Sequence, residues 1–149
     1  MASIVILGVL VSILFYEATD VTPGGIIVPG LMVLYFNQVT RILYTVGVAI
    51  LAYFLVKLLS RRFIIFGKRR FVLLIIFSLG LHYLINFVFG LFASDVSVVT
   101  VSVIGYTISG IIANNIYKQG IKRTVPALAI VVCFLELIVI GMTQLGIPI

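Results

Sequence analysis

The few ionisable and amide side chains of this chain lie inside or beside long apolar stretches. Glu136 lies within one such stretch, where an unpaired charge in a membrane costs roughly 2.5–3.5 kcal/mol. His82 and Asn86 are four residues apart, so they share one face of a helix and are candidate hydrogen-bond partners for Glu136. We expect a buried polar cluster, with a proton relay or a substrate contact as the alternative. Glu17 closes the first apolar stretch and is the fourth candidate buried polar residue, with a simple interfacial position as its alternative.

Side-chain sets typical of an enzyme active site are missing from the sequence. It contains no phosphate-cradling GxxxxGK(S/T) loop, and no Ser/His/Asp or Cys/His set for nucleophilic catalysis. Cys133 is the only cysteine, so an intrachain disulfide and a cysteine metal site are both excluded. We therefore expect no catalytic residue, no metal and no bound cofactor on this chain.

Basic residues gather in two short segments between apolar stretches, residues 60–70 and 118–123. This placement predicts membrane orientation, so the net charge of +6 does not indicate nucleic-acid binding. The first segment is also a candidate surface for docking a partner or an anionic polymer, because arginine grips carboxylates through paired hydrogen bonds. Anionic lipid headgroups suit it as well. The candidate docking residues are Arg61, Arg62, Lys68, Arg69 and Arg70.

A proline- and glycine-rich segment, residues 22–30, precedes a short apolar run and the polar pair Asn37-Gln38. Proline removes a backbone donor and glycine lowers helix propensity, so we expect a broken helix here. Broken helices at membrane depth can line a path for a polar substrate. The alternative is close helix packing through small residues. The candidates from this segment are Pro23, Gly25, Pro29, Gly30, Asn37 and Gln38.

Composition points to an all-α integral membrane protein. The 149 residues are 63% hydrophobic and 9% charged, with a mean hydropathy of +1.37, whereas a soluble domain carries about 25% charged residues. Stretches of about 20 apolar residues recur, and each can cross a bilayer. The predicted spans are residues 3–16, the broken segment up to 36, and residues 42–59, 71–92, 96–116 and 125–145. We expect a small bundle of about six spans, or five if the broken segment is re-entrant.

The basic segments orient the bundle. They place residues 60–70 and 118–123 in the cytoplasm, and counting back through three crossings places Arg41 and the N-terminus outside. The loop around Asp95 is then outside as well. We predict one transmembrane domain over residues 1–149, with a first half at 1–59, a cytoplasmic loop at 60–70 and a second half at 71–149.

The two halves resemble each other. The run IVPGL at residues 27–31 matches TISGI at 107–111, and polar residues follow both. Because each half has three spans, the two repeats are inverted, as in many transporters that work at the repeat interface. We expect a second glycine-broken helix around Gly110. Gly110, Asn114 and Gln119 complete the candidate path residues.

Several of these motifs are similar to a known family. The pattern from Glu17 to Gly30, the basic segment from Ser60 to Phe71, and GIIAN at 110–114 followed by Gln119-Gly120 resemble the PgsC/CapC family. This family is the membrane protein of bacterial poly-γ-glutamate synthesis and capsule formation. The similarity covers nearly the whole chain. One departure is Ser109, where the family pattern leads us to expect a proline before Gly110.

The resemblance implies a set of partners. Family members act with an ATP-dependent amide ligase (PgsB/CapB), a membrane-anchored subunit (PgsA/CapA) and a small membrane peptide, and they make poly-γ-glutamate. ATP and magnesium are expected on the ligase, so we expect this chain to be a non-catalytic subunit for synthesis and export in the bacterial cell membrane. The alternatives are a small secondary transporter or channel on the inverted-repeat scaffold, and a purely structural anchor for the ligase.

Overall fold

The computed structural model describes residues 2–36, 38–62, 67–92 and 103–144. In these residues the chain forms helices and no strand, so the predicted all-α class is confirmed for this part of the chain. The helices are α1 (Ala2–Thr19), α2 (Val28–Leu34), α3 (Val39–Leu59), α4 (Lys68–Phe92), α5 (Val103–Gln119) and α6 (Ile121–Gln144).

Three of these helices are long and apolar enough to cross a membrane. They are α3, α6 and residues 68–88 of α4, while α1 contributes a shorter apolar helix over residues 4–19. Many large apolar side chains on these helices are exposed on the outer surface, for example Leu43, Leu84 and Leu137. An outer surface of this kind is suited to hydrocarbon rather than water.

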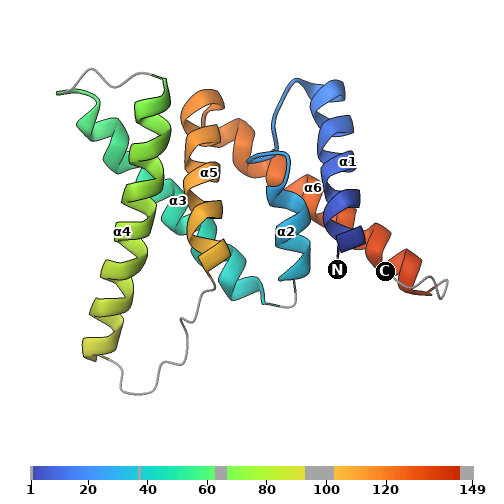
Figure 1. Ribbon diagram of the computed structural model, residues 1–149. Coiled ribbons are helices and arrows are strands. Elements are labelled where there is room, and N and C mark those ends of the chain that lie inside the picture. The colour runs from blue at the N-terminus through green and yellow to red at the C-terminus, as the bar shows by residue number, and fades with distance from the viewer. Residues whose placement is uncertain (1, 37, 63–66, 93–102, 145–149) are drawn as a thin grey trace.

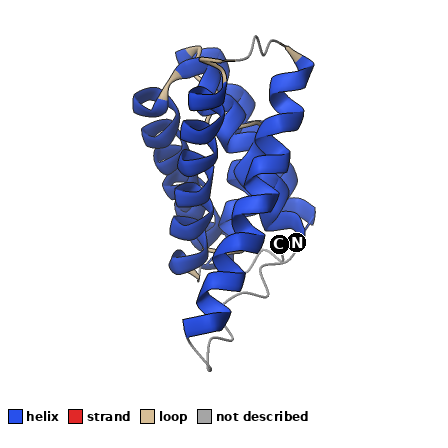
Figure 2. Ribbon diagram, turned by 90° about the vertical axis from the view of Figure 1, so that its left-hand side faces the viewer, coloured by secondary structure: helices blue, strands red, loops and turns tan. Residues whose placement is uncertain are grey.

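The helices form two groups of three, and each group contains two helices from one half of the sequence and one helix from the other half. α1 and α2 pack together with α6, and α4 and α5 pack together with α3. Figure 1 shows α3 leaving α2 to cross behind α5 and reach α4, while α6 leaves α5 to cross behind α2 and α1. Contacts of α5 with α6 and with α2 join the two groups. Figure 2 views the bundle from the side of α4, with the loops at its two ends.

The ends of the helices lie at two opposite ends of the bundle. The end of α1, the end of α3, the start of α4, and the turn between α5 and α6 lie at the upper end in Figure 1. The start of α1, the start of α3 and the end of α6 lie at the lower end. Both basic segments therefore share the upper end, and Arg41 lies at the lower end. The sequence analysis predicted this relation.

The predicted helix break is present between α1 and α2. Residues 21–27 are not helical, and Asp20, Gly24 and Gly25 have φ values of 53°, 70° and 127°. α2 begins directly afterwards, with Pro29 in its first two positions, where its missing N–H costs no helical hydrogen bond. The break thus precedes Pro29-Gly30. With seven residues, α2 is only about 10 Å long.

The second break, expected around Gly110, is a wrong prediction. Gly110 lies inside α5, which is continuous from Val103 to Gln119. Ser109 stands where the first half has Pro29, and serine keeps the backbone donor and adds no ring clash. One glycine alone lowers helix propensity by about 1 kcal/mol, which does not end a helix packed on its neighbours. Residues 96–102 of the predicted span lie outside the described residues.

Other helix boundaries also differ from the predicted spans. α4 begins at Lys68, so three basic residues of the predicted loop form its first turn. α6 begins at Ile121, and only Gly120, with a φ of 89°, separates it from α5. Polar residues at the end of a span continue the helix beyond the apolar stretch, and the hydropathy pattern does not register that extension.

The buried positions of the first half recur in the second half. Gly8 and Ser12 of α1 are buried, as are Ser78 and His82 of α4, 70 residues later. All five buried residues of α2 (Val28, Pro29, Gly30, Met32, Val33) have buried counterparts in α5 at a spacing of 80 (Ile108, Ser109, Gly110, Ile112, Ala113). The five of α3 (Thr45, Val48, Ala49, Ala52, Val56) match buried residues of α6 at a spacing of 79 (Thr124, Ala127, Leu128, Val131, Leu135).

Candidate functional site

The irregular segment 21–27 is held by one amide side chain of α5. Asn115 Nδ2 donates hydrogen bonds to the carbonyl oxygens of Gly24 (2.8 Å) and Ile111 (3.0 Å). Its Oδ1 accepts a hydrogen bond of 3.3 Å from the hydroxyl of Thr22. Thr22 in turn accepts a hydrogen bond from Nε2 of Gln119. The bond to Gly24 gives a buried backbone carbonyl of the non-helical segment the partner that it requires, and the bonds of Thr22 attach the segment to α5.

The same segment is wedged between α5 and α6. A Cβ atom added at Gly24 would lie 3.2 Å from Leu128 of α6 and 3.5 Å from Ile112 of α5. Pro23 and Gly24 are buried. The positive φ values of Gly24 and Gly25 favour glycine at both positions. Residues of both halves therefore meet here, and we call Thr22, Gly24, Asn115 and Gln119 the segment anchor.

One acceptor of the segment anchor is unused. Oε1 of Gln119 is buried and has no hydrogen-bond partner among the described residues. Leaving a buried carbonyl without a partner costs about 1–3 kcal/mol. A donor from another molecule or a rearranged segment would offset this cost.

Glycines also allow a close approach of helices within each half. The backbones of α1 and α2 meet at Gly8 and Gly30, where a Cβ atom added at Gly8 would lie 2.3 Å from Cα of Gly30. In the second half, a Cβ atom added at Gly110 would lie 3.0 Å from Cα of Ile75 and 3.0 Å from Oγ of Ser78. Gly30 and Gly110 are therefore helix-packing positions in this structure, as the alternative interpretation of small residues describes.

The predicted path residues occupy three separate places. Pro23, Gly25 and Gln119 lie together at the segment anchor, whereas Pro29 and Gly30 lie in α2 and Gly110 faces α4. Gln38 is exposed at the lower end between α2 and α3. Asn114 is half-buried, with no hydrogen bond from its side chain among the described residues. Asn37 lies outside the described residues.

The predicted cluster of three polar residues does not form. His82 of α4 is fully buried, its Nε2 lies 3.3 Å from Oγ of Ser109 on α5, and its ring meets Tyr44 of α3 edge-on at 5.1 Å. Glu136 is half-buried on α6, the helix that packs on α1, α2 and α5. Glu136 and His82 are separated because α6 packs mainly with α1 and α2, whereas α4 packs with α3 and α5. His82 and Ser109 instead join helices within one group.

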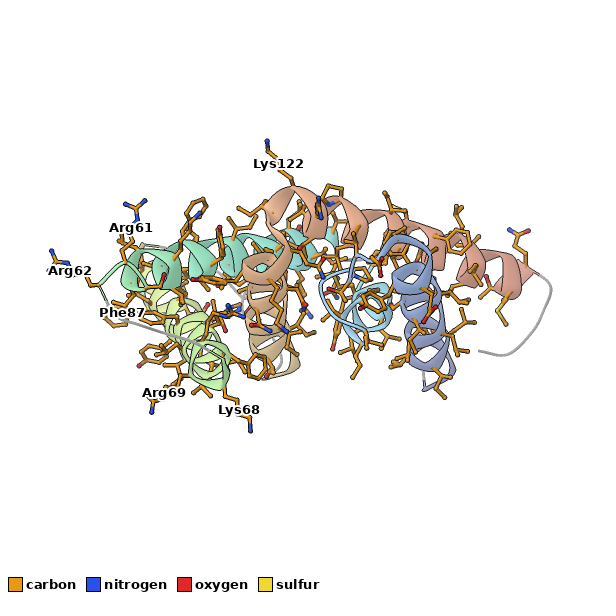
Figure 3. The ribbon with its side chains drawn as sticks, turned by 90° about the horizontal axis from the view of Figure 1, so that it is seen from above. Arg61, Arg62, Lys68, Arg69, Phe87 and Lys122 are labelled. Carbon is orange, nitrogen blue, oxygen red and sulfur yellow. The ribbon has the colours of Figure 1, made fainter. Side chains whose placement is uncertain are left out.

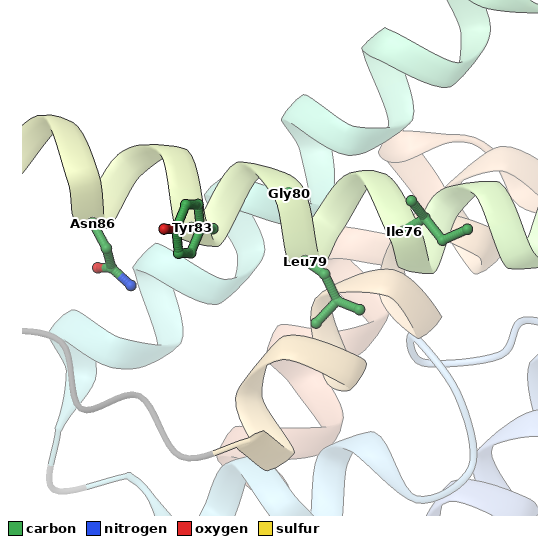
Figure 4. A pocket seen from close by; sticks show the side chains of 5 residues that line it. All are labelled: Ile76, Leu79, Gly80, Tyr83 and Asn86. Atoms are coloured by element: carbon green, nitrogen blue, oxygen red, sulfur yellow. The ribbon is translucent and has the colours of Figure 1, made fainter.

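Asn86 is half-buried on α4. With Ile76, Leu79, Gly80 and Tyr83 it lines an open groove along this helix, shown in Figure 4. Its Oδ1 is buried and has no hydrogen-bond partner in the described part of the chain. Glu17, the other predicted buried polar residue, is exposed near the end of α1.

Four of the five basic docking residues point away from the bundle. Arg61, Arg62, Lys68 and Arg69 are exposed, and we call them the basic rim. Figure 3 looks down on the upper end and shows Arg61 and Arg62 pointing outward beyond α3, Lys68 and Arg69 outward from α4, and Lys122 outward from α6. Because these cations diverge, they suit an extended acidic surface rather than one enclosed ligand.

Arg70 behaves differently from the rim. It is half-buried, and its guanidinium carbon lies 4.5 Å from the ring centre of Tyr117 on α5. The hydroxyl of Tyr117 is hydrogen-bonded to Ser60 at 3.2 Å. This contact joins the beginning of α4 to the ends of α3 and α5.

Sequence reasoning missed Asn115, Thr22 and Tyr117. A signal for Asn115 was present, because Ile108, Ile112 and Ile116 recur every four residues and mark the buried face of α5. Asn115 lies on that face, while Asn114 is turned away by about 100°. No comparable signal identifies Thr22, whose role depends on the path of the irregular segment.

Comparisons with known proteins extend along most of the chain. The family model described as capsule biosynthesis CapC matches residues 7–125. The PGA biosynthesis protein CapC of Bacillus subtilis (strain 168) is 38% identical over 120 residues, covering 80% of this chain and 79% of that protein. The capsule biosynthesis protein CapC of Bacillus anthracis is 33% identical over 121 residues, covering 80% of each chain. No solved structure gives a significant match. This chain therefore belongs to the capsule biosynthesis CapC family.

Proposed function

We propose that this chain is a multi-pass membrane subunit of a complex that synthesises and exports poly-γ-glutamate. The observation that carries the proposal is the CapC family match, which includes both the segment anchor and the basic rim. The three long apolar helices support a location in the bacterial cell membrane. The amide ligase, with its ATP and magnesium, is a partner subunit, accompanied by a membrane-anchored subunit and a small membrane peptide.

We propose six crossings, with the upper end of the bundle in the cytoplasm. α1 ends at the upper end and α3 begins at the lower end, so residues 20–36 pass from one end to the other. A re-entrant segment would return to the end where it began. Nine of the ten basic residues belong to the upper end, which is the arrangement expected for a cytoplasmic face.

We also propose that the two halves are inverted repeats. Their helices run in opposite directions, since α1 rises and α4 descends in Figure 1. The recurring burial at spacings of 70, 80 and 79 residues supports the same pairing of helices. So does the matching contact of Gly30 with Val5 and Gly8, and of Gly110 with Ile75 and Ser78.

The repeat architecture makes the segment anchor the proposed functional centre. Transporter sites lie where a broken helix meets the opposite repeat, and here the irregular segment of the first half meets Asn115 and Gln119 of the second. The unused Oε1 of Gln119 offers an acceptor at this place. A γ-linked polymer carries one amide N–H per residue, which is a donor of the required kind.

The basic rim is the proposed docking surface for the ligase or the growing polymer. Its four diverging cations face no carboxylate among the described residues, and arginine binds carboxylates through paired hydrogen bonds. Docking at the cytoplasmic end would hold ATP-dependent synthesis beside the membrane segment that exports the product.

The experiment replaces Arg61 and Arg62 together by Gln in cells that carry the complete synthesis system. We expect polymer output to fall at least tenfold, at an unchanged amount of membrane-inserted protein. The matched control replaces Lys122 and Arg123 by Gln, which removes the same charge from the same end. Equal output from the two double variants would show that the rim acts only through orientation.

A small secondary transporter is the second candidate function, and the inverted-repeat architecture favours it. The two functions differ in dependence on the ligase. Polymer synthesis by purified ligase in membranes with and without this chain separates them, because a transporter of small solutes leaves synthesis unchanged.

A further inference from the structure

A cluster of aromatic and basic side chains closes the upper end of the α3–α4–α5 group. The guanidinium of Arg70 lies over the ring of Tyr117, whose hydroxyl meets Ser60 at 3.2 Å. The rings of Tyr117 and Tyr53 contact edge-on at 5.9 Å. Nζ of Lys57 donates a hydrogen bond of 3.0 Å to the hydroxyl of Tyr53. Three helix ends thus hold two cations around a pair of tyrosines.

The stacking of Arg70 fixes the direction of its donors. A guanidinium over an aromatic ring gains a cation–π interaction and loses much of its freedom to rotate. The rim arginines have no such contact and are exposed. Membrane orientation requires positive charge at this end, but it does not require that one arginine be ordered against a tyrosine.

The cluster has positive charge and no counter-ion within the described residues. Nε of Arg70 is buried without a hydrogen-bond partner. The first turn of α4 contains no acidic residue, although the positive end of the helix dipole favours an anion there. The acidic residues that the structure describes are Glu17 and Asp20, on and just after α1, and Glu136 on α6, all on elements of the other group.

Apolar side chains continue from the cluster along the outer surface. Phe71 and Val72 follow Arg70 on α4 and are 38% and 51% exposed. Leu58, beside Lys57 on α3, is 65% exposed. A ligand that matches both features has an anionic head at the helix ends and a hydrocarbon tail along α3 and α4. A free carboxylate polymer would leave the apolar part uncovered.

We propose that Arg70, Tyr117, Ser60 and Lys57 form a binding site for the phosphate of one anionic phospholipid headgroup. The guanidinium binds the phosphate through two hydrogen bonds, and Lys57 adds a second positive charge. The bound phosphate supplies the missing counter-ion and links the ends of α3, α4 and α5. This inference rests on the membrane location proposed above, and it goes beyond polymer synthesis.

The test is lipid retention by the purified full-length chain, measured by native mass spectrometry after exchange into phosphatidylglycerol or phosphatidylcholine. We expect one strongly retained phosphatidylglycerol on the wild-type protein and no comparable retention of phosphatidylcholine. Arg70→Gln should weaken retention by about tenfold or more, since a charge-assisted hydrogen-bond pair is lost. Arg69→Gln is the matched control, because Arg69 is adjacent and exposed, and it should retain the lipid.

A second pair of variants covers the case in which Arg70→Gln does not fold. Tyr117→Phe keeps the aromatic platform and should retain the lipid, whereas Tyr117→Leu removes the platform and should lose it. Equal retention by all variants, or by Arg70→Gln and Arg69→Gln alike, would overturn the proposal. Displacement of the lipid by γ-linked glutamate oligomers would assign the cluster to the polymer instead. Because retention is measured without the ligase, failure of the synthesis proposal leaves this result interpretable.

Discussion

At the scale of single residues, Asn115 is the residue on which the irregular segment depends. Its amide donates to the carbonyl oxygens of Gly24 and Ile111 and accepts from the hydroxyl of Thr22, so one side chain joins the irregular segment to α5 through a backbone carbonyl and a side chain. Inside a membrane, a buried carbonyl such as that of Gly24 cannot form a hydrogen bond with water instead. The geometry of the segment anchor is therefore more sensitive to this side chain than to any apolar neighbour.

Asn115→Ala should lower both stability and polymer output. The change leaves the carbonyl of Gly24 without its partner, at a cost of about 1–3 kcal/mol, and the hydroxyl of Thr22 loses its acceptor while it keeps the bond from Gln119. Thermal denaturation in detergent and polymer yield measure the two effects. Asn114→Ala is the control, with the same chemistry one position away and no described hydrogen bond. A similar loss of stability from both variants would contradict the role given to Asn115.

The difference between Asn114 and Asn115 shows the limit of motif reasoning at this scale. The pair was visible in the sequence, and the pattern of Ile108, Ile112 and Ile116 identifies the face of α5 that is buried. That Asn115 bonds to Gly24, 91 residues away, depends on how the two halves pack. Residue-level periodicity predicts burial and leaves the partner open.

At the scale of helices, α2 and α5 contain similar sequences but differ in structure, because α2 begins beside its glycine and α5 continues through its glycine. Pro29 precedes Gly30 in the first turn of α2, whereas Ser109 precedes Gly110 in the middle of α5. The break before α2 was predictable because proline and glycine have strong local backbone preferences. The continuous α5 was mispredicted because the resemblance to IVPGL carried the proline effect to a position that has none.

Helix packing at Gly8 gives the prediction at this scale. Gly8→Ala should destabilise the α1–α2 pair, because the new methyl group would lie 2.3 Å from the backbone of Gly30 and no side chain can move to make room. Overpacking of this kind costs about 1–3 kcal/mol. Thermal denaturation of the purified protein measures the effect.

Gly47→Ala is the control for that experiment. Gly47 lies inside α3 with no atom within 4 Å of an added Cβ, so the substitution should be neutral or should stabilise the helix by up to about 1 kcal/mol. If Gly8→Ala is as stable as Gly47→Ala, then α1 and α2 do not approach as closely as the structure places them.

At the scale of the whole molecule, the last helix of each half packs against the first two helices of the other half. α3 packs mainly on α4 and α5, and α6 packs on α1 and α2. Hydropathy acts along the chain, and it predicted an all-α chain with long apolar helices. The exchange of α3 and α6 was not predictable, because both helices are long and apolar and hydropathy does not identify the neighbour on which a span packs. It also separates Glu136 from His82, which the sequence analysis had expected to be hydrogen-bond partners.

The exchange leads to a prediction about the two halves expressed as separate chains, residues 1–62 and 67–149. Alone, the first half leaves α3 without its main partners, and the second half leaves α6 without α1 and α2. We expect each half to be inserted but degraded or aggregated, because buried positions such as Ala52 and Val131 then lose their contacts. Produced together, the halves should copurify and restore polymer output, since the cut removes only the connection between α3 and α4.

Two variants test which contacts hold the halves together. Gly8→Ala in the first half should weaken copurification only modestly, because it acts within that half. Asn115→Ala in the second half acts between the halves and should weaken copurification strongly. Halves that are stable separately and do not copurify would contradict the exchange of helices.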